Sequence, residues 1–250
     1  MELGLRGRAA LVTGASKGIG RGIAAALVAE GARVAISSRS PDGIAATARE
    51  IGATGLAWDS ADVGGAAALV AAAQDALGAP IDVLVCNTGG PPAGADPLAF
   101  TQEQWEAAHR TLVLAPLALI AAVMPGMRER GWGRILNVAS TSVREPIPAI
   151  MLSNTERAGA LAAFKTIARM VAGDGVTLNT LLTGTILTDR SISLAGSEEA
   201  VRERARERIP AGRPGTVEEF AAVAAFLCGE PASYVTGAAI PVDGGMLQGV

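Results

Sequence analysis

Short apolar runs alternate with longer, alanine-rich stretches along the whole chain. The short runs are apolar at consecutive positions, which is the pattern of parallel strands covered by helices on both faces. Strands are predicted at 9–12, 33–37, 54–57, 83–86, 135–138, 176–181 and 239–242. Helices are predicted between them, near 19–30, 41–51, 64–77, 101–129, 154–172 and 216–228. The alternation indicates an α/β fold with one doubly wound parallel sheet of about seven strands.

One segment, 189–214, breaks this alternation. It is polar and charged, and it contains the run R-E-R-A-R-E-R at 202–208. The pattern is typical of a solvated helix face, but it also suits a substrate lid over a pocket at the carboxyl ends of the strands. The two interpretations are compatible. Since the chain shows no repeat, linker or second core, 1–250 is predicted to be a single domain.

Composition narrows the class of protein. Half of the residues are hydrophobic and 18% are charged, and the net charge is −3, so neither nucleic acid nor an anionic membrane is expected as a partner. Cys86 and Cys228 lie in apolar surroundings and are expected to be reduced. The longest apolar stretch, 112–127, is interrupted by two prolines, and 1–8 does not resemble a signal peptide. A cytoplasmic protein without a metal site is predicted.

The most informative motif is T-G-A-S-K-G-I-G at 13–20. It follows the first predicted strand and opens the first predicted helix, a geometry that presents backbone N–H groups to a phosphate. Its spacing, G-x-x-x-G-x-G, differs from the general dinucleotide pattern G-x-G-x-x-G, and no Gly-Lys-Ser/Thr follows, which excludes a P-loop. Taken alone, the motif also suits an ordinary glycine-rich turn.

Further segments agree with one family in order and spacing. They are C-N-T-G at 86–89, N-V-A-S at 137–140, L-N-T-L-L-T-G-T-I-L-T at 178–188, G-R-P-G at 212–215 and Y-V-T-G-A-A-I-P-V-D-G-G at 234–245. With them the chain resembles the short-chain dehydrogenases/reductases over nearly its whole length. The segments at 87–94 and 152–159 resemble a bacterial branch commonly labelled 3-oxoacyl-acyl-carrier-protein reductase-like.

The resemblance implies a Rossmann-like sheet, a nicotinamide cofactor and a small-molecule substrate. It also implies a homodimer or homotetramer, formed through the long helices near 101–129 and 154–172 and through the C-terminal segment. It assigns to the cofactor diphosphate the turn residues Gly14, Ser16, Lys17, Gly18, Ile19 and Gly20.

The end of the second strand bears on the choice of cofactor. An acidic residue there would bind the ribose 2′-OH and repel a 2′-phosphate, but this chain has Ser38 followed by Arg39. Arg39 alone suits a solvated loop cation, whereas Arg39 together with Lys17 suits a phosphate. NADP(H) is therefore favoured, with NAD(H) as the alternative.

The resemblance extends to the rest of the cofactor. It places Asp59 against the adenine; the rival Asp62 is better suited to capping the next helix. Asn87 and Gly89 retain part of the family's N-N-A-G turn. Finally, Ile186 and Thr188 match positions that hold the nicotinamide carboxamide.

The catalytic positions depart from the family pattern of Asn, Ser, Tyr and Lys. Ser140 is retained, whereas the Tyr, Lys and Asn positions fall on Ser153, Arg157 and Thr111. No shift of register supplies a tyrosine, because the only one is Tyr234, before the last strand. Lys165 and His109 are expected to be surface or interface residues on other helix faces.

Three functions remain open at this point. The first is an NADP(H)-dependent oxidoreductase that transfers hydride to or from a small carbonyl or alcohol, with the proton supplied by water or by the substrate. The second is a dinucleotide-binding protein without redox turnover, a pseudoenzyme or sensor. The third is a non-redox enzyme on the same fold, such as a dehydratase, isomerase or cyclase.

Overall fold

The computed structural model describes residues 1–249. Within them the strands form one parallel sheet in the order β3-β2-β1-β4-β5-β6-β7. The strands are β1 (Ala9–Val12), β2 (Arg33–Ser38), β3 (Thr54–Ala57), β4 (Val83–Cys86), β5 (Gly133–Ser140), β6 (Val176–Thr183) and β7 (Ala239–Val242). The order reverses between β1 and β4, and the prediction of a doubly wound, Rossmann-like sheet is confirmed.

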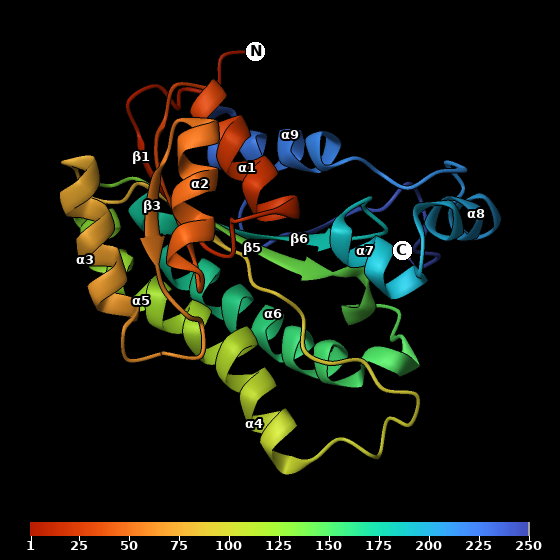
Figure 1. Ribbon diagram of the computed structural model, residues 1–250. Coiled ribbons are helices and arrows are strands. Elements are labelled where there is room, and N and C mark those ends of the chain that lie inside the picture. Colours follow the sequence, from red (N-terminus) through yellow and green to blue (C-terminus); the bar gives the residue numbers. More distant parts are fainter. Residues whose placement is uncertain (250) are drawn as a thin grey trace.

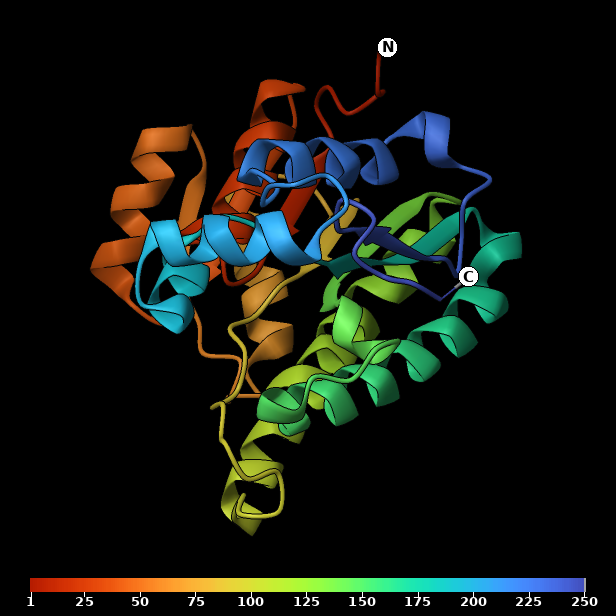
Figure 2. The same ribbon diagram turned by 90° about the vertical axis from the view of Figure 1, so that its right-hand side faces the viewer.

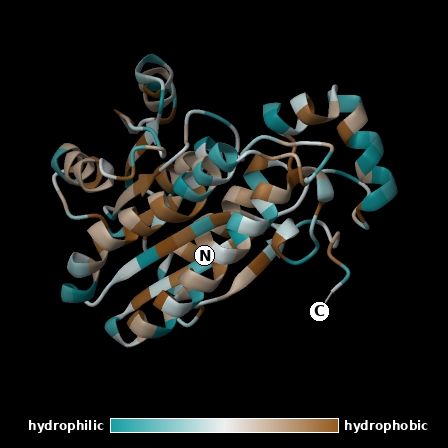
Figure 3. Ribbon diagram, turned by 90° about the horizontal axis from the view of Figure 1, so that it is seen from below, coloured by the Kyte–Doolittle hydropathy of each residue, from teal (hydrophilic) through white to brown (hydrophobic). Residues whose placement is uncertain are grey.

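Helices cover both faces of the sheet (Figures 1 and 2). One face carries α1 (Gly18–Ala29), α2 (Pro41–Ile51) and α9 (Val217–Cys228), and the other carries α3 (Ala66–Leu77), α5 (Ala115–Glu129) and α6 (Met151–Val171). Two apolar cores result, one around Phe220 and the other around Phe164, and both side chains are fully buried. Hydrophobic residues accordingly predominate in the strands, with some hydrophilic positions among them (Figure 3).

The two longest strands extend further than their apolar runs predict. β5 and β6 pair along their full length, so that Ser140 at the end of β5 lies beside Thr183 at the end of β6. The last residues of both strands are polar, so the predicted strands, which follow the apolar runs, end before the observed ones. The extension brings Ser140 to the carboxyl edge of the sheet, where open α/β sheets bind ligands.

The predicted helix 101–129 is interrupted. It consists of α4 (Gln102–His109), a π-helical turn η1 (Arg110–Leu114), and α5. Pro116, in the first turn of α5, has no N–H to give to the preceding turn, and a widened turn accommodates that loss. The stretch Gln102–Glu129 is long and apolar enough to cross a membrane by length and composition, but several of its side chains are buried against the sheet, so here it is a core helix.

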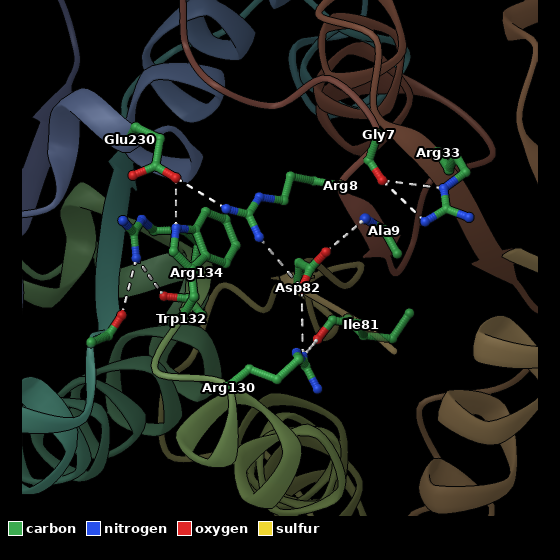
Figure 4. A network of polar contacts seen from close by, with 12 residues as sticks. Gly7, Arg8, Ala9, Arg33, Ile81, Asp82, Arg130, Trp132, Arg134 and Glu230 are labelled. Atoms are coloured by element: carbon green, nitrogen blue, oxygen red, sulfur yellow. Dashed lines mark hydrogen bonds and ion pairs between the residues drawn. The ribbon is translucent and has the colours of Figure 1, made fainter. Parts of the chain in front are cut away.

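The amino ends of the strands carry a polar cluster around Trp132 (Figure 4). The guanidinium carbons of Arg8 and Arg134 lie 3.8 and 4.4 Å from the centre of the indole ring. The indole N–H donates to Glu230 at 2.9 Å, and Arg8 pairs with the same carboxylate at 3.1 Å. Burial lowers the pKa of Arg134. This cluster joins elements far apart in sequence at the edge opposite the one where ligands bind.

The segment 189–214 contains two helices, α7 (Asp189–Ala195) and α8 (Glu198–Arg208). The side chains of Thr188 and Ser197 cap them by accepting hydrogen bonds from Ser191 N and Ala200 N. Figure 1 shows both helices at the end of the sheet toward which the arrowheads of β5 and β6 point. Their role as a lid stays a prediction.

Candidate active site

A cavity of about 850 Å³ opens at the carboxyl edge of the sheet. It lies between the loops that follow the strands and the two helices α7 and α8. Most of the predicted site residues line it, namely Gly14, Ser16, Lys17, Gly18, Ile19, Ser38, Arg39, Asn87, Gly89, Ser140, Ser153, Arg157, Ile186 and Thr188. Gly20, Asp59 and Thr111 do not.

The glycine turn after β1 packs closely against the turn after β4. A Cβ atom at Gly14 would lie 2.6 Å from the Asn87 carbonyl oxygen, and one at Gly20 would lie 2.6 Å from the Asn87 amide nitrogen. That nitrogen donates to the Gly14 carbonyl at 2.9 Å, and Thr13 Oγ1 donates to the Asn87 carbonyl at 2.8 Å. Gly20 therefore acts by close packing beneath the turn, and Asn87 braces the turn from the side.

The first turn of α1 faces the cavity without a capping side chain. Lys17 is the N-cap residue and its side chain makes no cap hydrogen bond, so backbone N–H groups of the first turn stay available. Gly18 has φ +56°, and the nearest atom to a Cβ there would be in Thr188, at 3.7 Å. Gly18 is thus required by its backbone conformation rather than by crowding, and it lines the cavity beside Thr188.

A second polar group faces the same end of the cavity from β2. Ser38 Oγ is buried and has no hydrogen-bond partner among the described residues, and Arg39 lines the cavity next to it. A buried hydroxyl without a partner is costly, and a ligand oxygen would relieve that cost. This end of the cavity therefore has the donors for a polar, negatively charged ligand.

Asp59 does not line the cavity, although its two neighbours Trp58 and Ser60 do. Side chains of successive residues in an extended segment point to opposite sides, so only every second one faces the ligand. The exposed Asp59 carboxylate accepts a hydrogen bond from Ala61 N at 2.9 Å, and Asp62 accepts one from Gly65 N at 3.0 Å, just before α3. Both acids thus order the loop.

Ser140, Ser153 and Arg157 form one wall of the cavity. Ser153 and Arg157 lie one turn apart on α6, and Arg157 Nε donates to Ser153 Oγ at 3.1 Å. Arg157 Nη1 donates to the Val138 carbonyl in β5 at 2.7 Å. Ser140 Oγ accepts a hydrogen bond from Ser142 N at 3.1 Å. Since both hydroxyls are fixed as acceptors, each keeps its own hydrogen to donate.

Arg157 is an unusual cation because nothing in its contacts carries a negative charge. Burial, and then the neighbouring Arg190, lower the pKa of Arg157 to about 10. The side chain is therefore protonated at neutral pH. It supplies positive charge to the wall of the cavity but does not exchange a proton there.

Thr111 lies behind this wall, in the π-helical turn. Its hydroxyl donates back to the Ala107 carbonyl at 2.9 Å, so it is held by its own helix. It lines a separate small cavity of about 20 Å³, together with Asn137, Thr88 and Arg157. A space of this size with several polar neighbours suits one water molecule.

The residues predicted to lie away from the chemistry do so. Tyr234 is fully exposed and does not line the cavity. Lys165 donates to the Gly237 carbonyl at 2.8 Å, and His109 Nδ1 lies 2.8 Å from a carboxylate oxygen of Glu156. In the part of the chain that the structure describes, no group of three acidic, histidine or cysteine residues could hold a metal ion.

Sequence reasoning missed three arginines that line the cavity from α7 and α8. They are Arg190, Arg204 and Arg208. The sequence did contain a sign of Arg204 and Arg208. In a helix, residues 201, 204, 205 and 208 share one face, so both arginines lie on the same face as Val201 and Ala205. Both small apolar residues are buried, so that face turns inward.

Comparison with known proteins identifies the family. A family profile described as "Enoyl-(Acyl carrier protein) reductase" matches residues 14–247. The chain is 36% identical over 248 residues to the 3-oxoacyl-[acyl-carrier-protein] reductase FabG of Vibrio harveyi, covering 98% of this chain and 99% of that one. It is 34% identical over 241 residues to a 2-dehydro-3-deoxy-L-rhamnonate dehydrogenase (NAD(+)) of a Sphingomonas species, covering 96% and 95%.

Solved structures agree with this result. The L-sorbose reductase of Gluconobacter frateurii, complexed with NADPH and L-sorbose, superposes with a TM-score of 0.93 at 31% identity over the full length of both chains. A 3-oxoacyl (acyl-carrier-protein) reductase of Agrobacterium tumefaciens with NADP bound has a TM-score of 0.90 at 33% identity, covering 97% of this chain and 95% of that one. The chain belongs to the short-chain dehydrogenase/reductase family, in its 3-oxoacyl-acyl-carrier-protein reductase-like branch.

Proposed function

We propose that this protein is an NADP(H)-dependent oxidoreductase that acts on a small carbonyl or alcohol substrate. One observation carries the proposal: the wall formed by Ser140, Ser153 and Arg157 faces the same cavity as the glycine turn and the cations Lys17 and Arg39. A dinucleotide reaching from the glycine turn toward that wall would bring its reactive ring to the two hydroxyls. The cofactors bound to related structures support this arrangement.

The residues present fit NADP(H) better than NAD(H). Ser38 Oγ is a buried hydroxyl without a partner, and Lys17 and Arg39 line the cavity at the end of β2, where no acidic side chain does. A 2′-phosphate would satisfy these donors, whereas an acid at this place would repel it. The relative named as NAD(+)-dependent shows that both cofactors occur among similar proteins.

When bound, the nicotinamide would supply or accept the hydride. Ser140 and Ser153 would donate hydrogen bonds to the substrate oxygen, because each hydroxyl already accepts one structural hydrogen bond. Arg157 would stabilise negative charge that develops on that oxygen. Neither Ser153 nor Arg157 is a good proton donor at neutral pH. We therefore assign the proton to water, for which the small cavity beside Thr111 and Arg157 has room.

Cofactor binding is the first test. NADPH and NADH are titrated by fluorescence into the wild type, into Arg39→Asp and into Arg6→Asp, an exposed control at the other edge of the sheet. Arg39→Asp is expected to weaken NADPH binding about tenfold or more and NADH binding far less, since it removes a charged hydrogen bond to the phosphate. Equal weakening of both cofactors would contradict the assignment.

Turnover is the second test. NADPH oxidation is followed against a panel of small aldehydes and ketones. Tight NADPH binding with no turnover on any member would count against oxidoreductase function and would favour a protein that binds the cofactor without redox chemistry. The double variant Ser153→Tyr, Arg157→Lys then shows whether the pocket is otherwise intact, since it restores the residues usual in the family.

We also propose a homodimer or homotetramer that forms through Gln102–Glu129 and α6. Both pack on the sheet with one side and expose the other, and Leu114 and Met170 present apolar side chains on the exposed sides. The two buried free thiols suit a reducing compartment such as the cytoplasm. Light scattering coupled to gel filtration gives the assembly, and a monomer at micromolar concentration would contradict it.

A further inference from the structure

The charge of the cavity is opposite to that of the chain. The whole protein has a net charge of −3, yet among residues 1–249 the only carboxylate that lines the cavity is that of Asp189. Its cationic lining consists of Lys17, Arg39, Arg157, Arg190, Arg204 and Arg208. The first two serve the 2′-phosphate in the function proposed above. The four others gather elsewhere, at the wall of hydroxyls and along α7 and α8, and the cofactor phosphate does not explain them.

Helix α8 carries two kinds of arginine. Arg202 and Arg206 form ion pairs with glutamates in the first turn of the helix, at 2.7 and 3.3 Å. Arg204 and Arg208 line the cavity on the face of the buried Ala205, and within residues 1–249 their side chains make no hydrogen bond or ion pair. The same helix thus neutralises its outer arginines and keeps those over the cavity free.

Arg190 extends this cationic surface from α7 toward the catalytic wall. Its guanidinium lies against Gly90, in the loop after β4, where a Cβ atom would collide with it. It is also close enough to Arg157 to lower the pKa of that side chain. No described carboxylate pairs with either guanidinium. Arg157 is half-buried and Arg190 is exposed, so their repulsion is partly screened by solvent, and a bound anion between them would offset what remains.

The remaining lining is apolar and indicates what else the ligand carries. The cavity is lined by Ile147 and Ile150, just before α6, and by Leu194 and Val201, on α7 and α8. Leu194 and Ile147 are more than one-third exposed, so both present apolar surface that a ligand in the cavity could cover. The pocket thus offers an aliphatic surface with guanidinium groups at its rim.

We propose that the substrate carries a carboxylate, bound by Arg190, Arg204 and Arg208, on a short aliphatic body whose carbonyl reaches Ser140 and Ser153. Planar guanidinium groups match carboxylate geometry in two-pronged contacts. The proposal deepens the oxidoreductase function and rests on it for the carbonyl, but the carboxylate site is testable by binding alone.

The probes are pyruvate, acetoacetate and levulinate, each compared with its methyl ester. Binding to the NADP⁺-saturated protein is measured by calorimetry, and NADPH oxidation is measured separately. At least one acid is expected to bind about tenfold or more tightly than its ester. Arg190→Gln and the double variant Arg204→Gln, Arg208→Gln should remove most of that difference. The matched double variant Arg202→Gln, Arg206→Gln makes the same charge change on the outer face and should leave it intact.

The outcomes separate the two proposals. If acids bind no better than esters, or if the inner and outer double variants behave alike, the carboxylate site is wrong whether or not NADPH is oxidised. If the Arg190, Arg204 and Arg208 variants weaken NADPH itself as much as the acid, these cations bind the cofactor diphosphate and the site is also wrong. Arginine-dependent binding of an acid without any turnover would support the carboxylate site while contradicting the oxidoreductase function.

Discussion

At the residue scale, the contact between Ser153 and Arg157 fixes the position of two groups that line the cavity. Ser153 and Arg157 lie four residues apart in a predicted helix, so their contact follows from helical geometry. The exposure of Asp59 and the hydrogen bond from Thr111 to its own helix do not follow from the sequence. The first depends on which side chains of the loop after β3 face the cavity, and the second on the position of the π-helical turn. Tertiary packing decides both.

Arg157 gives a pH-dependent prediction. Its pKa is lowered to about 10, so the positive charge is complete at neutral pH and is lost as the pH rises through 10. Carbonyl reduction should therefore fall above that pH while far-ultraviolet circular dichroism shows the fold intact. Arg157→Met should lower kcat/KM about 100-fold and abolish that pH dependence. Arg169→Met, an exposed change on the same helix, should do neither; a high-pH decline that persists in Arg157→Met would contradict the role.

The two cysteines give a second prediction. Cys86 and Cys228 are buried, and burial raises the pKa of each thiol to about 12. Thiolate is the reactive form, so neither should react at neutral pH with a chromogenic disulfide reagent while the protein is folded. Both should react at once in denaturant. Rapid reaction of either thiol in the native protein would show that its surroundings open readily.

At the element scale, apolar runs locate the central strands β1, β4, β5 and β6 because these are buried along nearly their whole length, and the partly buried edge strands β3 and β7 are apolar enough to be found in the same way. The interruption of 101–129 was not predictable from apolarity, since the chain is apolar at nearly every position from 112 to 124 and the shift caused by one π-helical turn leaves no visible break there. Residues of segment 189–214 line the cavity, and the role of this segment as a lid stays a prediction. Arg204 and Arg208 line the cavity, but they could not be told apart in the sequence from Arg202 and Arg206, because the whole run 202–208 is typical of a solvated helix face.

The amino end of α9 carries a helix cap whose contribution to stability depends on pH. Glu219 completes a capping box with Thr216 and is held by Arg213 at 2.6 Å. Hydrogen bonds from Arg213 lower the pKa of Glu219 from 4.5 to about 2. Because the folded-state pKa is depressed, the ionised carboxylate stabilises the protein above pH 4.5, and that contribution is lost as the pH falls toward 2.

Glu219→Gln keeps the shape of the capping box and removes only the charge. It should lower Tm slightly at pH 7, because the pair is exposed and solvent screens it. The difference from the wild type should shrink as the pH falls from 4.5 toward 2. Thermal unfolding of both proteins over this range provides the measurement, and a difference independent of pH would show that the charge is not its source.

At the scale of the whole molecule, the two edges of the sheet have different tasks. The carboxyl edge holds uncapped backbone groups, a hydroxyl without a partner and cations without anions. The amino edge holds the cluster around Trp132, in which charges are paired and the buried Arg134 donates to backbone carbonyls. Function and stability should therefore be separable by mutation at opposite ends of the same strands.

Trp132→Ala tests that separation. It removes a ring stacked between two guanidinium groups and leaves Glu230 without the indole N–H, so it should lower the free energy of unfolding by about 2–4 kcal/mol. The NADPH dissociation constant should stay as in the wild type, because the ring lies at the edge away from the cavity. Arg39→Asp should show the reverse pattern, with weak NADPH binding and nearly unchanged stability. Urea unfolding and NADPH titration of both variants supply the comparison, and loss of NADPH affinity in folded Trp132→Ala would mean that the sheet couples its two edges.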